Sequence, residues 1–295
     1  MKHLILFLIV FSTNVLIYAQ SFPSDPNACE LITSDIDNFW KAFNLMENGY
    51  EGNPFDAYYM KIGSQGVIDF TPYRIEHADT LYHNVKRHKQ KYLDVKASTF
   101  RVKEKKKQIR AAFYALKYIF PEAKFPPVYF VIGNFNSGGT STPNGLIIGA
   151  ETQNNIDNVP YIVAHELIHF QQKRYHQNPS LLDQSINEGI ADFLGEMISG
   201  SHINTVAYKY GESNKDKLCK EFVKIMDSNN WDDWLYGTSG KDDRPNDLGY
   251  WMGYQIGKSY YEKQPDKTTA IKAMLDIKDA NEFLEKSGYL DDYLD

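Results

Sequence analysis

Apolar residues recur every three or four positions through much of the first 120 residues. In residues 33–47 such a stripe follows Ser34 and Asp37, a pair that resembles a capping box at a helix start. Similar patterns predict helices over three further stretches: 54–62, 75–95 and 103–119. We therefore expect an N-terminal helical region spanning residues 20–120.

The pattern changes after Pro121. Residues 128–132 are β-branched or aromatic and predict a strand, and residues 146–149 predict a second one. The segment 133–145 between them is rich in Gly, Ser, Thr and Asn, which is typical of a loop. We expect the two strands to form a hairpin with a long tip.

Helical periodicity returns in the C-terminal third. Ser180 and Asp183 form a second capping box before an apolar stripe that reaches residue 197, and residues 214–228 predict another helix. Glycines then recur every four residues (Gly249, Gly253 and Gly257), which favours close packing of two helices. This order predicts an α+β fold, mostly helical, with a small central sheet.

Composition and charge narrow the class of protein. The 295 residues are 42% hydrophobic and 24% charged, which is typical of a globular chain with a sizeable core. A net charge of −6 gives no indication of a nucleic-acid partner. Two cysteines, Cys29 and Cys219, are far apart in the sequence, which leaves a disulfide and two free thiols both open.

The chain begins with a short basic start and an interrupted apolar run. Residues 1–19 predict a signal peptide cleaved after Ala19, with an uncleaved N-terminal anchor as the alternative. No later stretch is apolar enough to cross a bilayer. We therefore expect an exported protein, periplasmic or secreted.

The strongest chemical signal is the sequence H-E-x-x-H at residues 165–169. On a helix, His165 and His169 lie one turn apart on one face and can bind one metal ion, while Glu166 can reach a metal-bound water. Pro160 suits the first turn of that helix, and the apolar residues around the motif indicate that the helix is buried.

A hydrolytic zinc site needs a third protein ligand. The extended pattern H-E-x-x-H-x-x-G-x-x-H is not met, because Gln172 and Tyr175 occupy its glycine and last histidine positions. Glu188 is the better candidate, because a helix hairpin would return it to the two histidines. Asp192, one turn further on the same face, could accept a hydrogen bond from a ligand histidine.

These motifs carry a family resemblance. His165-Glu166-x-x-His169 followed by Asn187-Glu188-x-x-Ala191-Asp192 resembles the gluzincins, zinc peptidases with two His and one Glu as ligands. The Gly138–Thr140 loop and the Leu248–Tyr254 stretch resemble one uncharacterised bacterial branch, the zinc-dependent proteases related to the gliding-motility lipoprotein B. That resemblance implies a zincin-like region over residues 121–295, packed with the N-terminal helices as one unit. The lipoprotein members carry a cysteine at the signal cleavage site, and this chain has none.

Taken together, the sequence predicts a zinc-dependent metallopeptidase acting on peptide or protein substrates, with Glu166 as general base. Tyr250 and Tyr254 are the candidates for stabilising the oxyanion, with two core aromatics as the alternative reading. Asn187 and Asp192 are expected to contact the side chains of the Zn²⁺ ligands and hold them in place, without contacting the metal. The rival hypothesis is a non-proteolytic zinc-binding protein of the cell envelope that acts in gliding motility or secretion.

Overall fold

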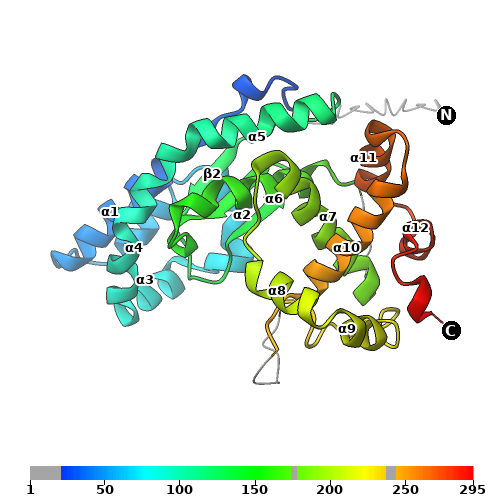
Figure 1. Cartoon of the computed structure of the whole chain (residues 1–295). Helices are drawn as coiled ribbons and strands as arrows, with labels where there is room; N and C mark the ends of the chain where they lie inside the picture. Colours follow the sequence, from blue (N-terminus) through cyan, green and yellow to red (C-terminus); the bar gives the residue numbers. More distant parts are fainter. Residues whose placement is uncertain (1–20, 174–177, 237–243, 295) are drawn as a thin grey trace, which may run out of the picture.

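A computed structural model describes residues 21–173, 178–236 and 244–294 (Figure 1). The predicted signal peptide, residues 1–19, and Tyr175 lie outside these residues. The helices and strands are, in order: η1 Pro26–Ala28, β1 Leu31–Ile32, α1 Ser34–Glu47, η2 Asp56–Met60, α2 Gln65–Phe70, η3 Thr71–Ile75, α3 Ala78–Arg87, α4 Lys89–Arg101, η4 Val102–Lys105, α5 Lys106–Ile119, β2 Val128–Val131, β3 Gly139–Thr142, β4 Gly145–Gly149, η5 Ala150–Thr152, η6 Ile156–Asn158, α6 Val159–Gln171, α7 Leu181–Ser199, α8 Thr205–Ser213, α9 Lys215–Phe222, α10 Leu248–Lys263, α11 Lys267–Leu275, α12 Ala280–Ser287 and η7 Asp291–Tyr293. The protein is mostly helical with a small mixed sheet, which confirms the predicted α+β class.

Each predicted stretch contains helix, but residues 75–95 are divided between α3 and α4, and the helix predicted over 214–228 ends at Phe222. Ser180 and Asp183 make the expected capping box at the start of α7. At α1 the N-cap is Thr33 and no side chain caps the helix, so the capping box expected at Ser34 is wrong. Residues 54–62 contain the short π-helix η2.

The expected hairpin between residues 128–132 and 146–149 is wrong. The strand order is β1-β2-β4-β3, and β2 and β4 are parallel, with Val131 opposite Gly149. Strand β3 forms inside the predicted loop and pairs antiparallel with β4, with Thr142 opposite Gly145. The loop is long enough to carry the chain back along the sheet, so the tight turn connects β3 and β4 instead.

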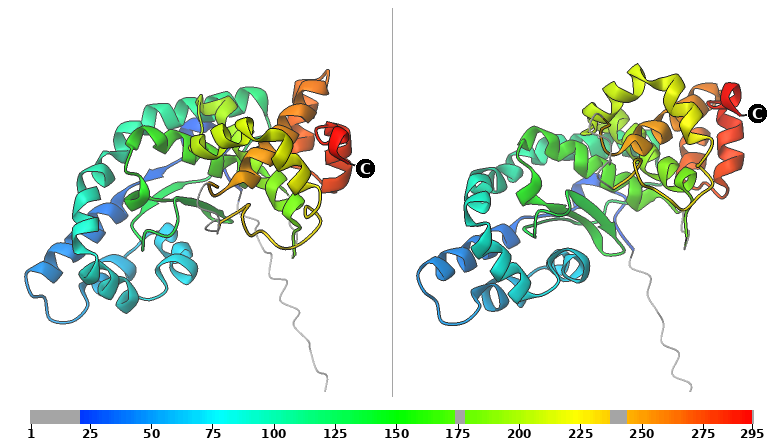
Figure 2. Two further views of the ribbon diagram at one scale, coloured as in Figure 1. Left: turned by 60° about the horizontal axis from the view of Figure 1, so that its bottom comes forward. Right: turned by 90° about the horizontal axis from the view of Figure 1, so that it is seen from below.

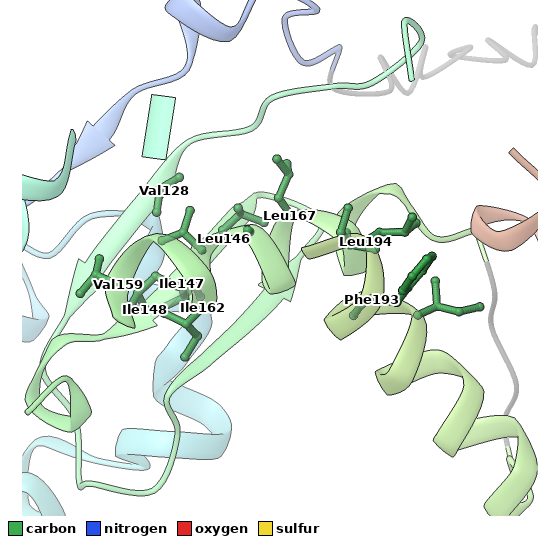
Figure 3. Packing of buried hydrophobic residues seen from close by; sticks show 14 of the residues in the cluster. Val128, Leu146, Ile147, Ile148, Val159, Ile162, Leu167, Phe193 and Leu194 are labelled. Atoms are coloured by element: carbon green, nitrogen blue, oxygen red, sulfur yellow. The ribbon is translucent and has the colours of Figure 1, made fainter. Parts of the chain in front are cut away.

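Helices cover both faces of this sheet (Figure 2). Every residue of β2 and β4 is buried, which requires cover on both sides because successive side chains point to opposite faces. On one face, α6 packs against β4, with Leu167 beside Leu146 and Ile162 beside Ile148 (Figure 3). On the other face, α2 comes so close that a Cβ on Gly66 would lie 2.3 Å from Cβ of Tyr129.

Helix α7 lies between α6 and α10. A Cβ on Gly253 of α10 would lie 1.7 Å from the carbonyl oxygen of Ser185 on α7. A Cβ on Gly189 would lie 2.0 Å from the backbone nitrogen of Tyr254. The two backbones are therefore in direct contact, which confirms the close helix packing predicted from the glycine repeat.

Both cysteines are buried and free, so the thiol alternative applies to Cys29 and Cys219. Burial raises the pKa of each thiol to about 11. In the described part of the chain, no helix combines the length and apolar character needed to cross a membrane.

Candidate metal centre

Helix α6 presents its two histidines toward one point. Pro160 lies in the first turn of the helix, and the apolar residues beside the motif fix the helix against the sheet and α7. The Nε2 atoms of His165 and His169 are 2.9 Å apart. The sequence places both rings on one helix face, and the packing of α6 keeps that face on the inside of the molecule.

Glu188 of α7 reaches the same point, although it is nineteen residues from His169 along the chain. Its Oε2 atom lies 3.0 Å from Nε2 of His169 and 3.3 Å from Nε2 of His165. Tetrahedral zinc at about 2.0–2.1 Å from each donor needs donors about 3.3 Å apart. The three side chains therefore fit a metal ion.

The other carboxylate oxygen of Glu188 is held from behind. Gln184, one turn earlier on α7, donates its side-chain amide to Oε1 of Glu188 at 3.0 Å. The Tyr236 hydroxyl donates to the same oxygen, and Gln184 also donates to the Tyr236 hydroxyl at 2.8 Å. With Oε1 engaged in this way, Oε2 is the oxygen that faces the histidines.

Each histidine is also held at its second ring nitrogen. Nδ1 of His165 lies 2.8 Å from Oδ1 of Asp192, and Nδ1 of His169 lies 2.7 Å from Oε1 of Gln172. When Nδ1 carries the hydrogen and donates it to these oxygens, Nε2 is left with a lone pair for a metal. The two oxygens are therefore placed to accept from the tautomer that metal binding requires.

The charges of the group depend on one another. Burial opposes the charged form of His165, but hydrogen bonds with Asp192 and Glu188 outweigh it and raise the pKa of the imidazole. Burial likewise opposes the charged form of Glu188, but His169 and His165 hold the pKa of its carboxyl well below the usual range. Glu188 therefore keeps its negative charge beside the two imidazoles although it is buried.

Glu166 lies where β3 crosses α6. A Cβ on Gly139 would be 2.6 Å from Oε1 of Glu166, so this strand passes directly over the carboxylate. Burial raises the pKa of Glu166. Glu166 and the three candidate metal ligands line one cavity of about 910 Å³. The cavity extends along residues 136–141, including the first three residues of β3.

Of the two tyrosines predicted to act, the structure brings one into the cavity. The Tyr250 ring stacks on His165 with centroids 6.0 Å apart, and Tyr250 lines the cavity. Tyr254 does not line it, because its hydroxyl donates to Glu196 at 2.6 Å. Asn187 lines the cavity, and its backbone carbonyl accepts a hydrogen bond of 2.9 Å from Gln172.

Several supporting residues were not predicted from the sequence. Asp192 Oδ2 accepts hydrogen bonds from Asn204 at 2.7 Å and Tyr208 at 2.9 Å, and Gln172, Gln184 and Tyr236 hold the other ligands. Helical spacing could have indicated Gln172, which is three residues after His169. No local pattern indicates Tyr236, because a connection outside α7 brings it to Glu188.

Comparison with known protein families gives a match over the second and last thirds of the chain. Residues 102–284, more than half of the chain, match the family model described as "Predicted Zn-dependent protease (DUF2268)". The matched range contains all three candidate metal ligands and Glu166. No curated protein and no solved structure matches the chain.

Proposed function

Because the chain belongs to the family of predicted Zn-dependent proteases (DUF2268), we propose that it is a zinc metallopeptidase of the gluzincin type, with a zincin-like arrangement of α6 and β3. One observation carries the proposal. The donor atoms of His165, His169 and Glu188 converge at zinc-ligand spacing, and Glu166 lines the same cavity. A purely structural zinc site would not require that glutamate.

Zinc held by His165, His169 and Glu188 would polarise a peptide carbonyl and lower the pKa of a bound water. Glu166 is the group that takes the proton of the attacking water and passes it to the leaving amine. Its carboxylate is buried beneath β3 and lines the cavity that contains the three candidate metal ligands. Asp192 and Gln172 keep the two imidazoles in the orientation that binding requires.

Tyr250 is the side chain we assign to the developing oxyanion. It packs on His165 and lines the cavity, whereas the Tyr236 hydroxyl is already donated to Glu188. The substitution Tyr250→Phe should lower kcat and leave the zinc content unchanged. Unchanged kcat would remove Tyr250 from the mechanism.

Strand β3 provides a surface for an extended substrate. It is at one end of the strand order, and its residues Gly139, Thr140 and Ser141 line the cavity beside Glu166. A peptide added to an edge strand gains main-chain hydrogen bonds whatever its side chains. This placement brings a backbone carbonyl of the peptide close to the metal ligands.

The experiment compares metal content with hydrolysis. The purified protein should bind about one zinc per chain, and Glu166→Gln should keep that zinc while losing hydrolysis of a broad peptide library. Glu285→Gln, an exposed position on α12, is the matched control and should keep both. Zinc binding without any hydrolysis by the unmodified protein would favour the rival, non-proteolytic role.

We also propose that the protein is exported, on the basis of residues 1–19 alone. N-terminal sequencing of the protein recovered outside the cytoplasm should begin at Gln20. A chain that keeps its first residues would favour the uncleaved anchor.

A further inference from the structure

The cavity contains one positively charged residue that the proposed chemistry does not use. Among the described residues that line it, Arg74 is the only lysine or arginine, and the acids Glu166, Glu188 and Asp247 line it as well. No carboxylate in the described part of the chain forms a salt bridge with Arg74. Within the described residues the Arg74 guanidinium makes one hydrogen bond, a long one of 3.4 Å from Nη1 to the carbonyl oxygen of Asn136.

The backbone of Arg74 is fixed to the segment that leads into β3. Its carbonyl oxygen accepts hydrogen bonds from the side-chain amides of Asn134 at 3.1 Å and Asn136 at 3.0 Å. Asn134 also donates to the carbonyl of Ile75 at 3.2 Å. The half-buried Arg74 is therefore held at the amino end of the strand that we propose binds substrate.

Its charge also distinguishes the two directions in which a peptide could pair with β3. An antiparallel peptide brings its carboxyl end to the amino end of β3, where Arg74 lies. A parallel peptide brings its ammonium end there, next to a like charge. A guanidinium favours carboxylates through paired, charge-assisted hydrogen bonds, so the antiparallel direction is preferred.

We infer that Arg74 binds a carboxylate of the peptide substrate on the carboxyl-terminal side of the cleaved bond. This inference rests on the proposed peptidase function and adds a substrate class to it. Arg74 precedes the matched range 102–284, so the preference belongs to the N-terminal helices of this chain. The carboxylate has two sources, the free C-terminus of the peptide or an Asp or Glu side chain.

The test measures binding, so that it does not depend on turnover. The zinc-loaded Glu166→Gln protein is titrated with three peptides: Ala-Ala-Phe-Ala-Ala as the free acid, the same peptide as the C-terminal amide, and Ala-Ala-Phe-Asp-Ala as the amide. We expect at least one carboxylate peptide to bind about tenfold more tightly than the plain amide. An advantage of the free acid identifies the C-terminus, and an advantage of the aspartyl amide identifies a side chain.

The same titrations are then repeated with Arg74 altered. Arg74→Ala should abolish the difference between acid and amide, and Arg74→Lys should keep part of it. Arg87→Ala removes the same charge from an exposed position on α3 and should leave the difference unchanged. Comparing the peptides in the Arg74 and Arg87 variants distinguishes the effect of Arg74 from that of the metal, which could also attract a carboxylate.

Two results would overturn the inference: no carboxylate peptide binds more tightly than the plain amide, or the advantage persists in Arg74→Ala. Failure of the peptidase proposal would look different. In that case the unmodified, zinc-loaded protein would hydrolyse no member of the peptide library, whatever the effect of Arg74 on binding.

Discussion

The contact between α7 and α10 gives a sharp prediction, because two glycines on one helix have different neighbours. At Gly253 a new Cβ would lie 1.7 Å from the carbonyl oxygen of Ser185 and 2.4 Å from its carbonyl carbon. These are backbone atoms, which no rotamer change can move. At Gly257 the nearest atoms are side-chain carbons of Ile190 and Met274, at 3.2 and 3.4 Å.

The magnitudes follow from these distances. Real Cβ atoms essentially never approach closer than 3.0 Å, so Gly253→Ala must separate the helices locally by at least 1.3 Å. Overpacking a core lowers the unfolding free energy by about 1–3 kcal/mol when side chains can adjust. For Gly253→Ala we expect a loss of at least about 3 kcal/mol, because the backbone must move. The unfolding free energy of Gly257→Ala should stay within about 1 kcal/mol of that of the unmodified protein, because alanine also favours the helix.

In the assay, both variants are saturated with zinc and unfolded with urea, and circular dichroism monitors the unfolding. The expected order of unfolding free energy is Gly257→Ala close to the unmodified protein and Gly253→Ala far below. If Gly257→Ala is soluble and Gly253→Ala is insoluble, this result also supports the backbone contact between α7 and α10. Equal stability of the two variants would refute the direct backbone contact between α7 and α10.

Two further predictions concern the candidate metal centre, and a third concerns Glu151, a buried residue of η5. Asp192→Asn should weaken zinc binding about 10- to 100-fold, because the amide no longer offers His165 a charged acceptor, and a zinc titration with a competing chelator would measure this loss; unchanged affinity would mean that Asp192 does not orient the ring. Tyr236→Phe should weaken zinc binding about tenfold in the same titration, because one hydrogen bond that fixes Glu188 is lost, whereas an effect on folding alone would contradict this role. Burial raises the pKa of Glu151 from 4.5 to about 7, so the folded protein keeps a proton that the unfolded chain releases, and the unfolding free energy should fall by roughly 3 kcal/mol as pH rises from about 4.5 to 7. Glu151→Gln should remove that part of the pH dependence in denaturant titrations, and an unchanged slope would show that Glu151 is not the group responsible.

Local patterns were sufficient for the helices around the site. The capping box at Ser180 and Asp183 marks the start of α7, and Pro160 lies in the first turn of α6 as expected. Such signals depend on neighbours within one or two turns, which the sequence displays directly. The glycine repeat is also a local pattern, and it predicted close helix packing. It did not identify α7 as the partner helix.

Long-range pairing could not be obtained in this way. The apolar runs at 128–132 and 146–149 predict two strands, but their parallel direction depends on a third strand that forms in the polar segment between them. β3 is half-buried and contains Gly, Thr and Ser, so its sequence resembles a loop. Its extended form depends on pairing with β4 and on the surface of α6.

The same limit applied to the tyrosines. Tyr250 and Tyr254 are one turn apart on α10, and the spacing alone could not show that only Tyr250 lines the cavity. Tyr254 instead donates to Glu196, a contact between two helices far apart in the sequence. Tyr236 and Arg74 come to the cavity from distant segments, so their placement required the tertiary structure.

The two-residue strand β1 has a practical consequence for anyone who expresses the matched family region alone. β1 pairs in parallel with β2 through Leu31 and Ile32, and it precedes the matched range by seventy residues. A protein truncated to residues 102–284 would leave that side of β2 without its neighbour and would strip α2 from the face carrying Tyr129. An unpaired, apolar strand edge can pair with other chains. Such a fragment should therefore aggregate under conditions in which the longer polypeptide stays in solution.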